Sequence, residues 1–341
     1  MDDLQFGMRD KRGNWKPTAR IEIAPFYQIP PNIRSIIKWL PGYFLPWNLF
    51  FAISAVAYWA WIVPPVETLK TFAWGWIFKL WLVNTISVIL FYGAFELRLY
   101  LRRAQGTRFK FNHKFPADTP SNIFWFSKQN IDNFLRGMLT GVPIWTAVQG
   151  IVLWAYANEL APWLSIAESP VYLFMLALLV PVIHEIHFFY IHRLIHTPFL
   201  YKHVHSVHHN SINPSPWSSL AMHPVEHMLY FSTMFYHLII PSNPIIALYQ
   251  LHYAGFGAVP GHIGFDKIEV GKNSAVDSHA YTHYLHHKYF EVNYGDGLVP
   301  LDKIFGTWHD GSKESDEIMK ERFRKKQERA SARKTRSGPV A

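Results

Sequence analysis

Long stretches without a charged residue constrain the fold of this chain more than any other feature. No charge occurs across residues 39–66, and crossing the hydrocarbon core of a bilayer takes about 20 mainly apolar residues. Further uncharged stretches follow at residues 80–95, with 72–77 extending the same helix, at 137–158 and at 170–183. We therefore expect an all-α integral membrane protein with about four transmembrane helices, arranged as two hairpins.

A fifth apolar stretch, residues 228–253, is interrupted by Pro241 and Pro244. Proline removes a helical hydrogen bond and bends or ends a helix, so this stretch predicts a re-entrant or interfacial hairpin. Half of the residues are hydrophobic and 17% are charged, which suits one membrane-embedded domain over residues 39–312 better than two water-soluble cores. Residues 1–38 are then an N-terminal cytoplasmic segment, and residues 313–341 form a basic tail.

The positive charge of the chain is unevenly distributed. The formal net charge is +9, and Lys and Arg gather beside apolar segments, at residues 11–20, 98–114 and 320–336. A nucleic-acid-binding surface would also be basic, but this arrangement is typical of the excess of Lys and Arg on the cytoplasmic side of membrane proteins. With four crossings, both termini and the histidine-rich segments share that cytoplasmic side, and no nucleic-acid partner is expected.

The sequence contains no cysteine. Disulfides, thiolate catalysis, cysteine-ligated zinc and cysteine-held iron–sulfur clusters are therefore excluded. A metal ion would have to bind through nitrogen or oxygen. The polar residues 1–10 also lack the apolar core of a signal peptide, so we expect no removable leader.

Histidine is concentrated in one part of the chain, where 18 of the 19 histidines lie between His184 and His309. Eight of them form three ordered motifs, one HxxxH followed by two copies of HxxHH. These eight are His192, His196, His205, His208, His209, His283, His286 and His287. On a helix, residues three or four apart project from the same face, so the imidazoles of each motif can face a common centre.

Eight imidazoles exceed what one ion can bind. Transition metals take about four to six ligands, which makes two neighbouring ions the natural interpretation. Imidazole binds iron, zinc, copper and nickel, and spacing does not choose among them. Chemistry favours iron, because an all-histidine site in a membrane has few uses for zinc hydrolysis, whereas paired redox ions can activate dioxygen to attack an unactivated C–H bond of a lipid.

The part of the chain from residue 170 to residue 308 closely resembles the sterol desaturase and fatty acid hydroxylase superfamily. We expect a cytoplasmic helical cap to carry the metal site. Three histidine motifs in this order are specific, whereas residues 1–130 match only in being hydrophobic. The resemblance rests on residues 185–209, the motif at 283–287, Asn293-Tyr294-Gly295, Asp302 and Phe305-Gly306-Thr307.

This resemblance implies an oxygen-dependent enzyme with two iron ions that hydroxylates, desaturates or demethylates a sterol or an acyl lipid. The eight motif histidines inherit the metal-ligand role by position, and His223 and His262 resemble two further ligands of the family. No fused haem or flavin domain is recognisable, so electrons would come from an external donor such as a ferredoxin or a cytochrome b5-like protein with its reductase. No side chain is assigned as acid, base or nucleophile, because the metal centre performs the chemistry.

Glu185 stands seven residues before His192, about 20° away around a helix, where the family usually has an acidic residue. We expect its carboxylate to accept a hydrogen bond from an imidazole N–H, although a lone Glu at a helix end more often faces solvent. Five further histidines are not required by the family's core pattern, and the sequence leaves their role open. They are His184, His187, His203, His227 and His279.

Two other classes of function remain open at this point. The segment from His223 to His227 matches the inverted HxxEH zinc motif, which would make the protein a membrane zinc hydrolase but would leave three motifs unexplained. The other class is a non-catalytic membrane protein that binds metal or haem, although haem takes only one or two axial ligands. Two irons per chain would support the oxidase, one zinc the hydrolase, and no metal a scaffold.

Overall fold

The structure is a computed structural model that describes residues 1–116 and 120–336, most of them helical. The body of the bundle consists of α2 (Trp47–Trp61), α4 (Trp74–Phe95), α6 (Val142–Ala157), α7 (Pro170–Ile195) and α11 (Pro244–His262). The other α-helices are α1 (Ile33–Phe44), α3 (Val66–Leu69), α5 (Gln129–Arg136), α8 (Pro198–Leu200), α9 (Ser206–His209), α10 (Pro224–Phe231), α12 (Tyr281–Tyr289), α13 (Leu301–Ile304) and α14 (Lys313–Arg336). Short 3-10 or π turns are η1 (Asp3–Gln5), η2 (Pro25–Tyr27), η3 (Glu96–Leu101), η4 (Trp125–Ser127), η5 (Gly137–Gly141), η6 (Tyr201–His205), η7 (Pro216–Leu220) and η8 (Ser232–Leu238). The last five residues of the predicted basic tail, 337–341, lie outside the described residues.

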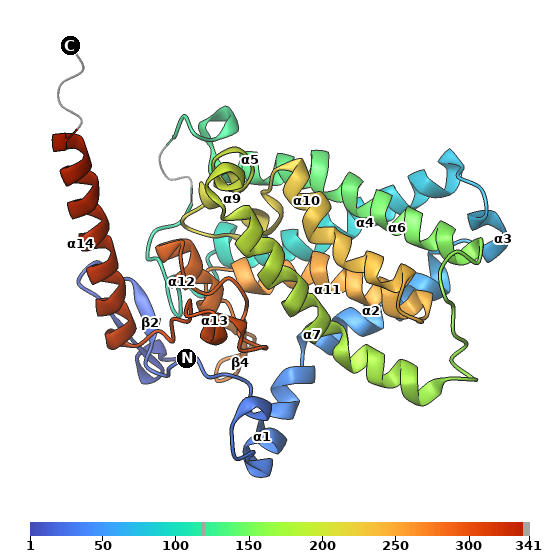
Figure 1. Ribbon diagram of the computed structural model, residues 1–341, viewed down its shortest axis with the longest axis horizontal. Helices are drawn as coiled ribbons and strands as arrows, with labels where there is room; N and C mark the ends of the chain where they lie inside the picture. Colours follow the sequence, from blue (N-terminus) through green and yellow to red (C-terminus); the bar gives the residue numbers. More distant parts are fainter. Residues whose placement is uncertain (117–119, 337–341) are drawn as a thin grey trace.

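Two small antiparallel hairpins depart from the all-α prediction. β1 (Gly7–Arg9) pairs with β2 (Trp15–Pro17), and β3 (Lys267–Glu269) pairs with β4 (Ala275–Asp277). Both hairpins lie at one end of the helical bundle (Figure 1). The membrane-type helices are therefore joined to a polar end that contains short β-ribbons.

Three helical stretches are long and apolar enough to cross a membrane: Trp74–Leu101, Gln129–Ala157 and Pro170–Ile195. A fourth results if α1 and α2, which meet at a bend of 44°, are counted as one span. These stretches contain the uncharged segments of the sequence and extend beyond them by a few charged residues. Large apolar side chains are exposed along them, such as Leu90 at 67% and Phe174 at 63%, as expected of surfaces that face acyl chains.

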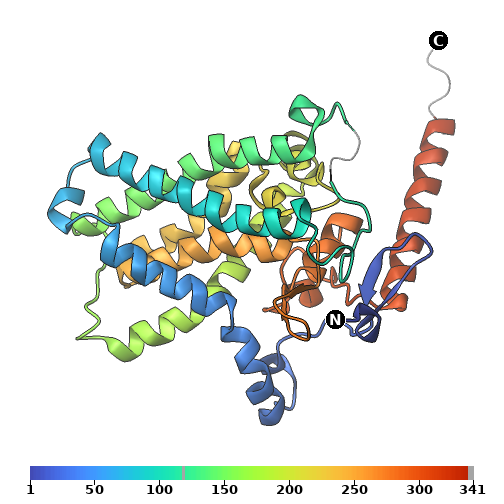
Figure 2. The same ribbon diagram turned by 180° about the vertical axis from the view of Figure 1, so that it is seen from behind.

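The apolar stretch that contains Pro241 and Pro244 folds into a hairpin, whose second arm, α11, runs through the middle of the bundle (Figure 2). Pro244 is the first residue of α11. Backbone N–H groups in the first turn have no acceptor within the helix, so a proline there costs no helical hydrogen bond. α11 approaches α6 so closely at Gly255 that a Cβ atom there would lie 1.9 Å from the Trp145 ring. This packing fixes the helix that carries His262 at its C-terminal end.

Segments far apart in the sequence gather at one end of the bundle (Figure 1). There the N-terminal hairpin, α12, α13 and the start of α14 lie near the C-terminal end of α7. The N-terminal hairpin, α12 and α14 share an apolar core that includes Trp15, Phe109 and Met319. Nearby, Arg108 donates two hydrogen bonds to the Glu269 carboxylate. The N-terminal hairpin, the histidine motifs and the start of α14 thus occupy the same end of the bundle; that this end is cytoplasmic stays a prediction from charge.

Candidate metal centre

The first histidine motif lies at the C-terminal end of α7. The helix ends at Ile195, and Pro198 prevents its continuation. Because His192 and His196 are one turn apart, their rings face the same side of the helix, with centroids 5.0 Å apart. The apolar helix therefore presents two imidazoles at the point where it leaves the bundle.

The second and third motifs lie on short helices that face this end of α7. η6 and α9 carry the second motif, and α12 carries the third. α12 ends at Tyr289, and the positive φ of 65° at the next residue, Phe290, turns the chain away from the helix axis. Three segments separated by many residues are thereby brought to one place.

Five imidazoles form a first group: His192, His196, His205, His209 and His286. One ring nitrogen of each lies within 4.8 Å of those of the other four. The Nε2 atoms of His196, His209 and His286 are 3.1–3.2 Å apart, and the Nε2 atoms of His192 and His205 are 3.2 Å apart. All are buried except His196, which is half-buried.

Four imidazoles form a second group, and all four are buried: His208, His262, His283 and His287. The Nε2 atom of His262 lies 3.1 Å from that of His208 and 2.9 Å from that of His283. The Nε2 atoms of His283 and His287 are 3.1 Å apart. The structure thus divides the eight motif histidines between two centres and adds His262 to the second.

Hydrogen bonds on the far side of the rings determine which nitrogen carries the proton. The Nδ1 atoms of His192, His286 and His262 donate to backbone carbonyl oxygens at 2.7, 2.7 and 2.9 Å. Those carbonyls belong to Tyr294, Val292 and Ala258. A carbonyl oxygen only accepts, so each neutral ring is protonated at Nδ1 and its Nε2 atom carries a lone pair.

The Nε2 atoms point at one another within each group. His192 and His205 both donate from Nδ1, so their two Nε2 lone pairs face each other at 3.2 Å. Two lone pairs at about 3 Å repel unless a cation lies between them. Metal–imidazole bonds of about 2.0–2.1 Å, set at right angles, place their nitrogen atoms about 3 Å apart, which is the separation of the neighbouring Nε2 atoms in both groups. The donor sets therefore fit a transition-metal ion in each group.

Burial favours the protonation state that metal binding requires. It lowers the pKa of His205, His208 and His283 well below the ordinary value, and the neighbouring imidazoles lower it further. Neutral imidazole is the form that binds a metal ion. The rings are therefore ready to bind metal at neutral pH.

Glu226 supports the first group, a role that the sequence interpretation did not give it. Its Oε1 atom accepts a hydrogen bond from His205 Nδ1 at 2.8 Å, and the two side chains are only 4% and 2% exposed. A carboxylate behind a ligating imidazole fixes the ring and raises its basicity. The available signal was the acidic residue of the HxxEH pattern.

Glu185 has partners other than the imidazole expected from the sequence. Its carboxylate accepts hydrogen bonds from the backbone N–H groups of Asp296 and Gly297, both at 2.9 Å. A Cβ atom at Gly295 would lie 2.6 Å from Glu185 Oε1, so glycine is needed for this approach. Glu185 therefore holds the turn at residues 293–297, whose Tyr294 carbonyl orients His192.

Asp302 supports the same turn from its other side. Its carboxylate accepts the backbone N–H groups of Tyr294 and Gly295 at 2.9 and 2.8 Å, and also the Thr307 hydroxyl. Asn293 adopts a positive φ of 51° and donates to the His309 carbonyl. The residues that follow the third motif thus form a structural turn behind the first group.

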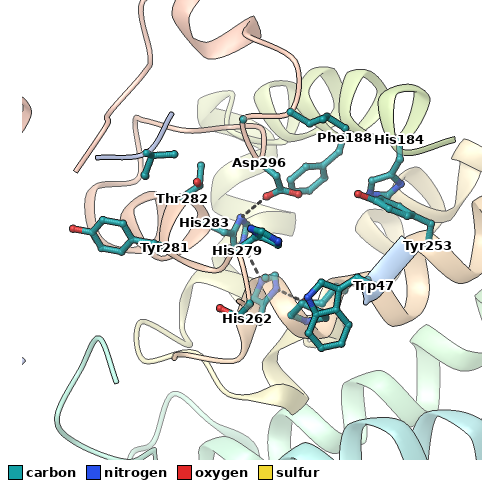
Figure 3. Close-up of a pocket in the computed structure, with 18 of the residues that line it drawn as sticks. Trp47, His184, Phe188, Tyr253, His262, His279, Tyr281, Thr282, His283 and Asp296 are labelled. Atoms are coloured by element: carbon teal, nitrogen blue, oxygen red, sulfur yellow. Dashed lines mark hydrogen bonds and ion pairs between the residues drawn. The ribbon is translucent and has the colours of Figure 1, made fainter. Parts of the chain in front are cut away.

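A cavity of about 480 Å³ reaches both groups, within the range of about 300–1,000 Å³ typical of ligand pockets. Its walls include His192 and His205 of the first group and His262 and His283 of the second. Figure 3 shows Phe188, Tyr253 and Trp47 around the histidines, with the Asp296 carboxylate turned towards His283. An apolar chamber therefore lies directly against the two candidate metal positions.

The residues of the HxxEH pattern do not converge. His223 lies outside both groups, and its Nδ1 atom accepts a hydrogen bond from Val225 N as the cap of α10. His227 Nε2 donates to the Leu220 carbonyl, and Glu226 faces His205. In the described parts of the chain, this segment therefore offers no shared zinc position.

The other unassigned histidines are dispersed. His184 and His279 line the cavity, and His279 has a positive φ of 61°. His187 contacts the Tyr236 hydroxyl and the Leu229 carbonyl. His203 is exposed beside Phe199. None of them lies in either histidine group.

Comparison with known proteins covers mainly this half of the chain. Residues 177–307 match the fatty acid hydroxylase family. A Delta(7)-sterol 5(6)-desaturase of Leptosphaeria maculans is 32% identical over 135 residues, which cover 39% of this chain and 35% of that protein. One from Gibberella zeae is 34% identical over 133 residues, covering 37% and 39%, and one from Candida albicans is 30% identical over 153 residues, covering 41% and 38%.

The alignments span well under half the length of these relatives. No solved structure is significantly similar to this chain. The matched residues contain all three histidine motifs, His223, His262 and the turn at 293–297. Through this histidine-bearing part, the chain is similar to the sterol desaturase and fatty acid hydroxylase superfamily, as its histidine motifs indicated.

Proposed function

We propose that this protein is a membrane oxidoreductase that uses two iron ions and dioxygen to oxidise a lipid. The observation that carries the proposal is the convergence of nine imidazoles, in two groups, at the wall of an apolar cavity. The relatives' names describe oxidation of a sterol, and the chain has helices long and apolar enough to cross a membrane. The two histidine groups thus support a pair of metal ions, the relatives support oxidation of a lipid, and the helices support a membrane setting.

The first group would hold one ion and the second group the other, with His223 excluded from the ligands. Iron bound in both groups would supply the redox chemistry that dioxygen activation requires. The protein's own residues bind and orient: backbone carbonyls fix the Nδ1 protons of His192 and His286, and Glu226 orients His205. The aromatic part of the cavity wall, which includes Phe188 and Tyr253, would limit water near the reacting carbon.

The substrate we propose is a sterol or another membrane lipid. Aromatic side chains, including Phe188, Tyr230 and Tyr253, line the cavity, and flat rings pack well against a sterol nucleus or an acyl chain. Whether oxidation adds a hydroxyl group or creates a double bond depends on where the substrate carbon lies relative to the two groups. The proposal therefore includes both reactions.

An external protein is proposed as the source of electrons. A ferredoxin or a cytochrome b5-like protein, with its reductase, would approach from the cytoplasm, on the side to which the basic clusters assign the metal groups. The net charge of +9 favours an acidic donor, because complementary charge accelerates encounter. Turnover driven by such a donor should therefore slow as ionic strength rises.

Lipid profiles of expressing cells test the proposal. We expect a new oxidised lipid in cells that make the unaltered protein and none in cells that make His286→Ala. The matched control is His113→Ala, since His113 contacts Asn14 and lies outside both groups; it should give the same product as the unaltered protein. Identical lipid profiles with the unaltered protein and with His286→Ala would overturn the proposal.

A further inference from the structure

Helix α1 has two different faces. At about 100° per residue, Ile33, Ile37, Pro41 and Phe44 fall on one side, which we call the outer stripe. Ile33 and Ile37 are 72% and 62% exposed. No residue of α1 is buried, so the outer stripe is an apolar surface without a covering element in the described parts of the chain.

Two cations border the outer stripe. Arg34 and Lys38 are one turn apart and both are exposed, and the helix positions put them beside the stripe on the same flank. An apolar stripe flanked by cations is the pattern of a helix that lies in the membrane interface, with its apolar side in the acyl region and its cations among the phosphates. Here that pattern belongs to a helix placed next to a span.

The position of α1 in the fold agrees with this pattern. It continues into α2 after a bend of 44°, and the exposed apolar side chains Leu49, Phe50 and Ile53 extend the surface along α2. In both views α1 stands off from the bundle, at the level where the bundle meets the polar end (Figures 1 and 2). The outer stripe is thus continuous with the surface that faces acyl chains.

The opposite face of α1 lines the cavity. Trp39 and Tyr43 are half-buried members of its wall, and exposed Gly42 also lines it. The Tyr43 hydroxyl donates a hydrogen bond to the Leu178 carbonyl of α7. This bond is a side-chain contact across the seam between α1 and α7, next to the part of the cavity wall that Trp39, Gly42 and Tyr43 form.

We infer that α1 lies in the plane of the membrane interface on its outer stripe, and that the seam between α1 and α7 is the entrance through which a membrane lipid reaches the cavity. The inference deepens the proposed function, because it gives the lipid an entry route. The outer stripe and the cavity-lining residues Trp39 and Tyr43 are on opposite faces of the same helix, α1. A lipid would therefore pass from the bilayer around α1 into the cavity without crossing water.

The absence of cysteine allows the position of α1 to be measured with single labels. The Ile37→Cys variant, labelled with an environment-sensitive fluorophore, would be reconstituted into phosphatidylcholine vesicles. The lipids would carry either no bromine or bromine atoms near the headgroup end of the acyl chains, where bromine quenches a nearby fluorophore. Ile53→Cys on α2 is the membrane reference, and Lys320→Cys on α14 is the aqueous reference. We expect bromine to reduce emission at position 37 at least about twofold, as at position 53; emission that responds only to soluble iodide, as at position 320, would overturn the inference.

The entrance is tested by a bulky maleimide on Gly42→Cys, a position where a Cβ atom meets no other atom within 4 Å. We expect labelling to slow lipid oxidation about tenfold relative to the unlabelled variant, with unchanged iron content. The same label on Ile53→Cys should leave the rate unchanged. An undiminished rate in labelled Gly42→Cys would overturn the entrance. A protein that holds two irons but oxidises no lipid would instead count against the proposed function. The fluorescence measurement decides the position of α1 in either case.

Discussion

Replacing Glu226 tests the support of the first group most sharply. The Glu226 carboxylate lies 2.8 Å from His205 Nδ1, and its other oxygen has no hydrogen-bond partner in the described structure. Glutamine keeps the size and an accepting oxygen but removes the charge, whereas alanine leaves a buried N–H without a partner. Such an N–H costs about 1–3 kcal/mol.

The two substitutions should therefore rank in a fixed order. Loss of a carboxylate behind a ligating imidazole typically weakens metal binding about 10–100-fold. We expect Glu226→Gln to lie near the lower limit, about 1.4 kcal/mol, and Glu226→Ala near the upper limit, about 2.8 kcal/mol. The second group should keep its affinity, because Glu226 bonds only to His205 of the first group among the histidines.

The assay is anaerobic titration of the metal-free protein with ferrous iron, against a chromogenic chelator. Glu96→Gln is the matched control, since Glu96 is a buried carboxylate that accepts a hydrogen bond from Asn130 and not from a histidine. Two results would refute the reasoning: unchanged iron affinity in both Glu226 variants, or an equal loss in Glu96→Gln.

Three further substitutions probe the fold around the site. Gly255→Ala should destabilise the bundle by about 1–3 kcal/mol, because the added methyl group meets Trp145; a lower midpoint of thermal unfolding in detergent would show it, and an unchanged midpoint would contradict the packing. Gly295→Ala should weaken iron binding in the first group without unfolding the protein, since it displaces the Glu185 carboxylate; full affinity would separate this turn from the site. Burial lowers the pKa of Lys110 from 10.5 to about 7. Between these two pH values the unfolded chain binds a proton that the folded chain does not, so the free energy of unfolding should rise with pH in this range. Lys110→Met should abolish that slope, measured by unfolding at pH 7 to 10, and an unchanged slope would assign it to other groups.

The sequence was sufficient for the parts of the fold that follow from local pattern. Uncharged length predicted the apolar helices, because the cost of burying charge in lipid limits where charges occur. The three histidine motifs predicted a shared centre, because their spacing places each set on one helix face. Both inferences depend only on residues close together in the chain.

Residues whose partners are distant in sequence could not be assigned in the same way. Glu226 and His205 are 21 positions apart, so the contact depends on how η6 packs against α10. His262 and His223 looked equivalent in sequence, yet only His262 reaches a group, because α11 passes through the bundle. Glu185 has the expected helical position, but the turn at residues 293–297 supplies its hydrogen-bond donors.

Metal content of the purified protein is the most direct test of the central claim. The protein would be produced in iron-supplemented medium and its metals measured by elemental mass spectrometry. It should contain two irons per chain, one for each histidine group. His196→Ala should lose the ion of the first group and His283→Ala that of the second. A protein that folds in membranes but holds no iron, or a single zinc, would contradict the account.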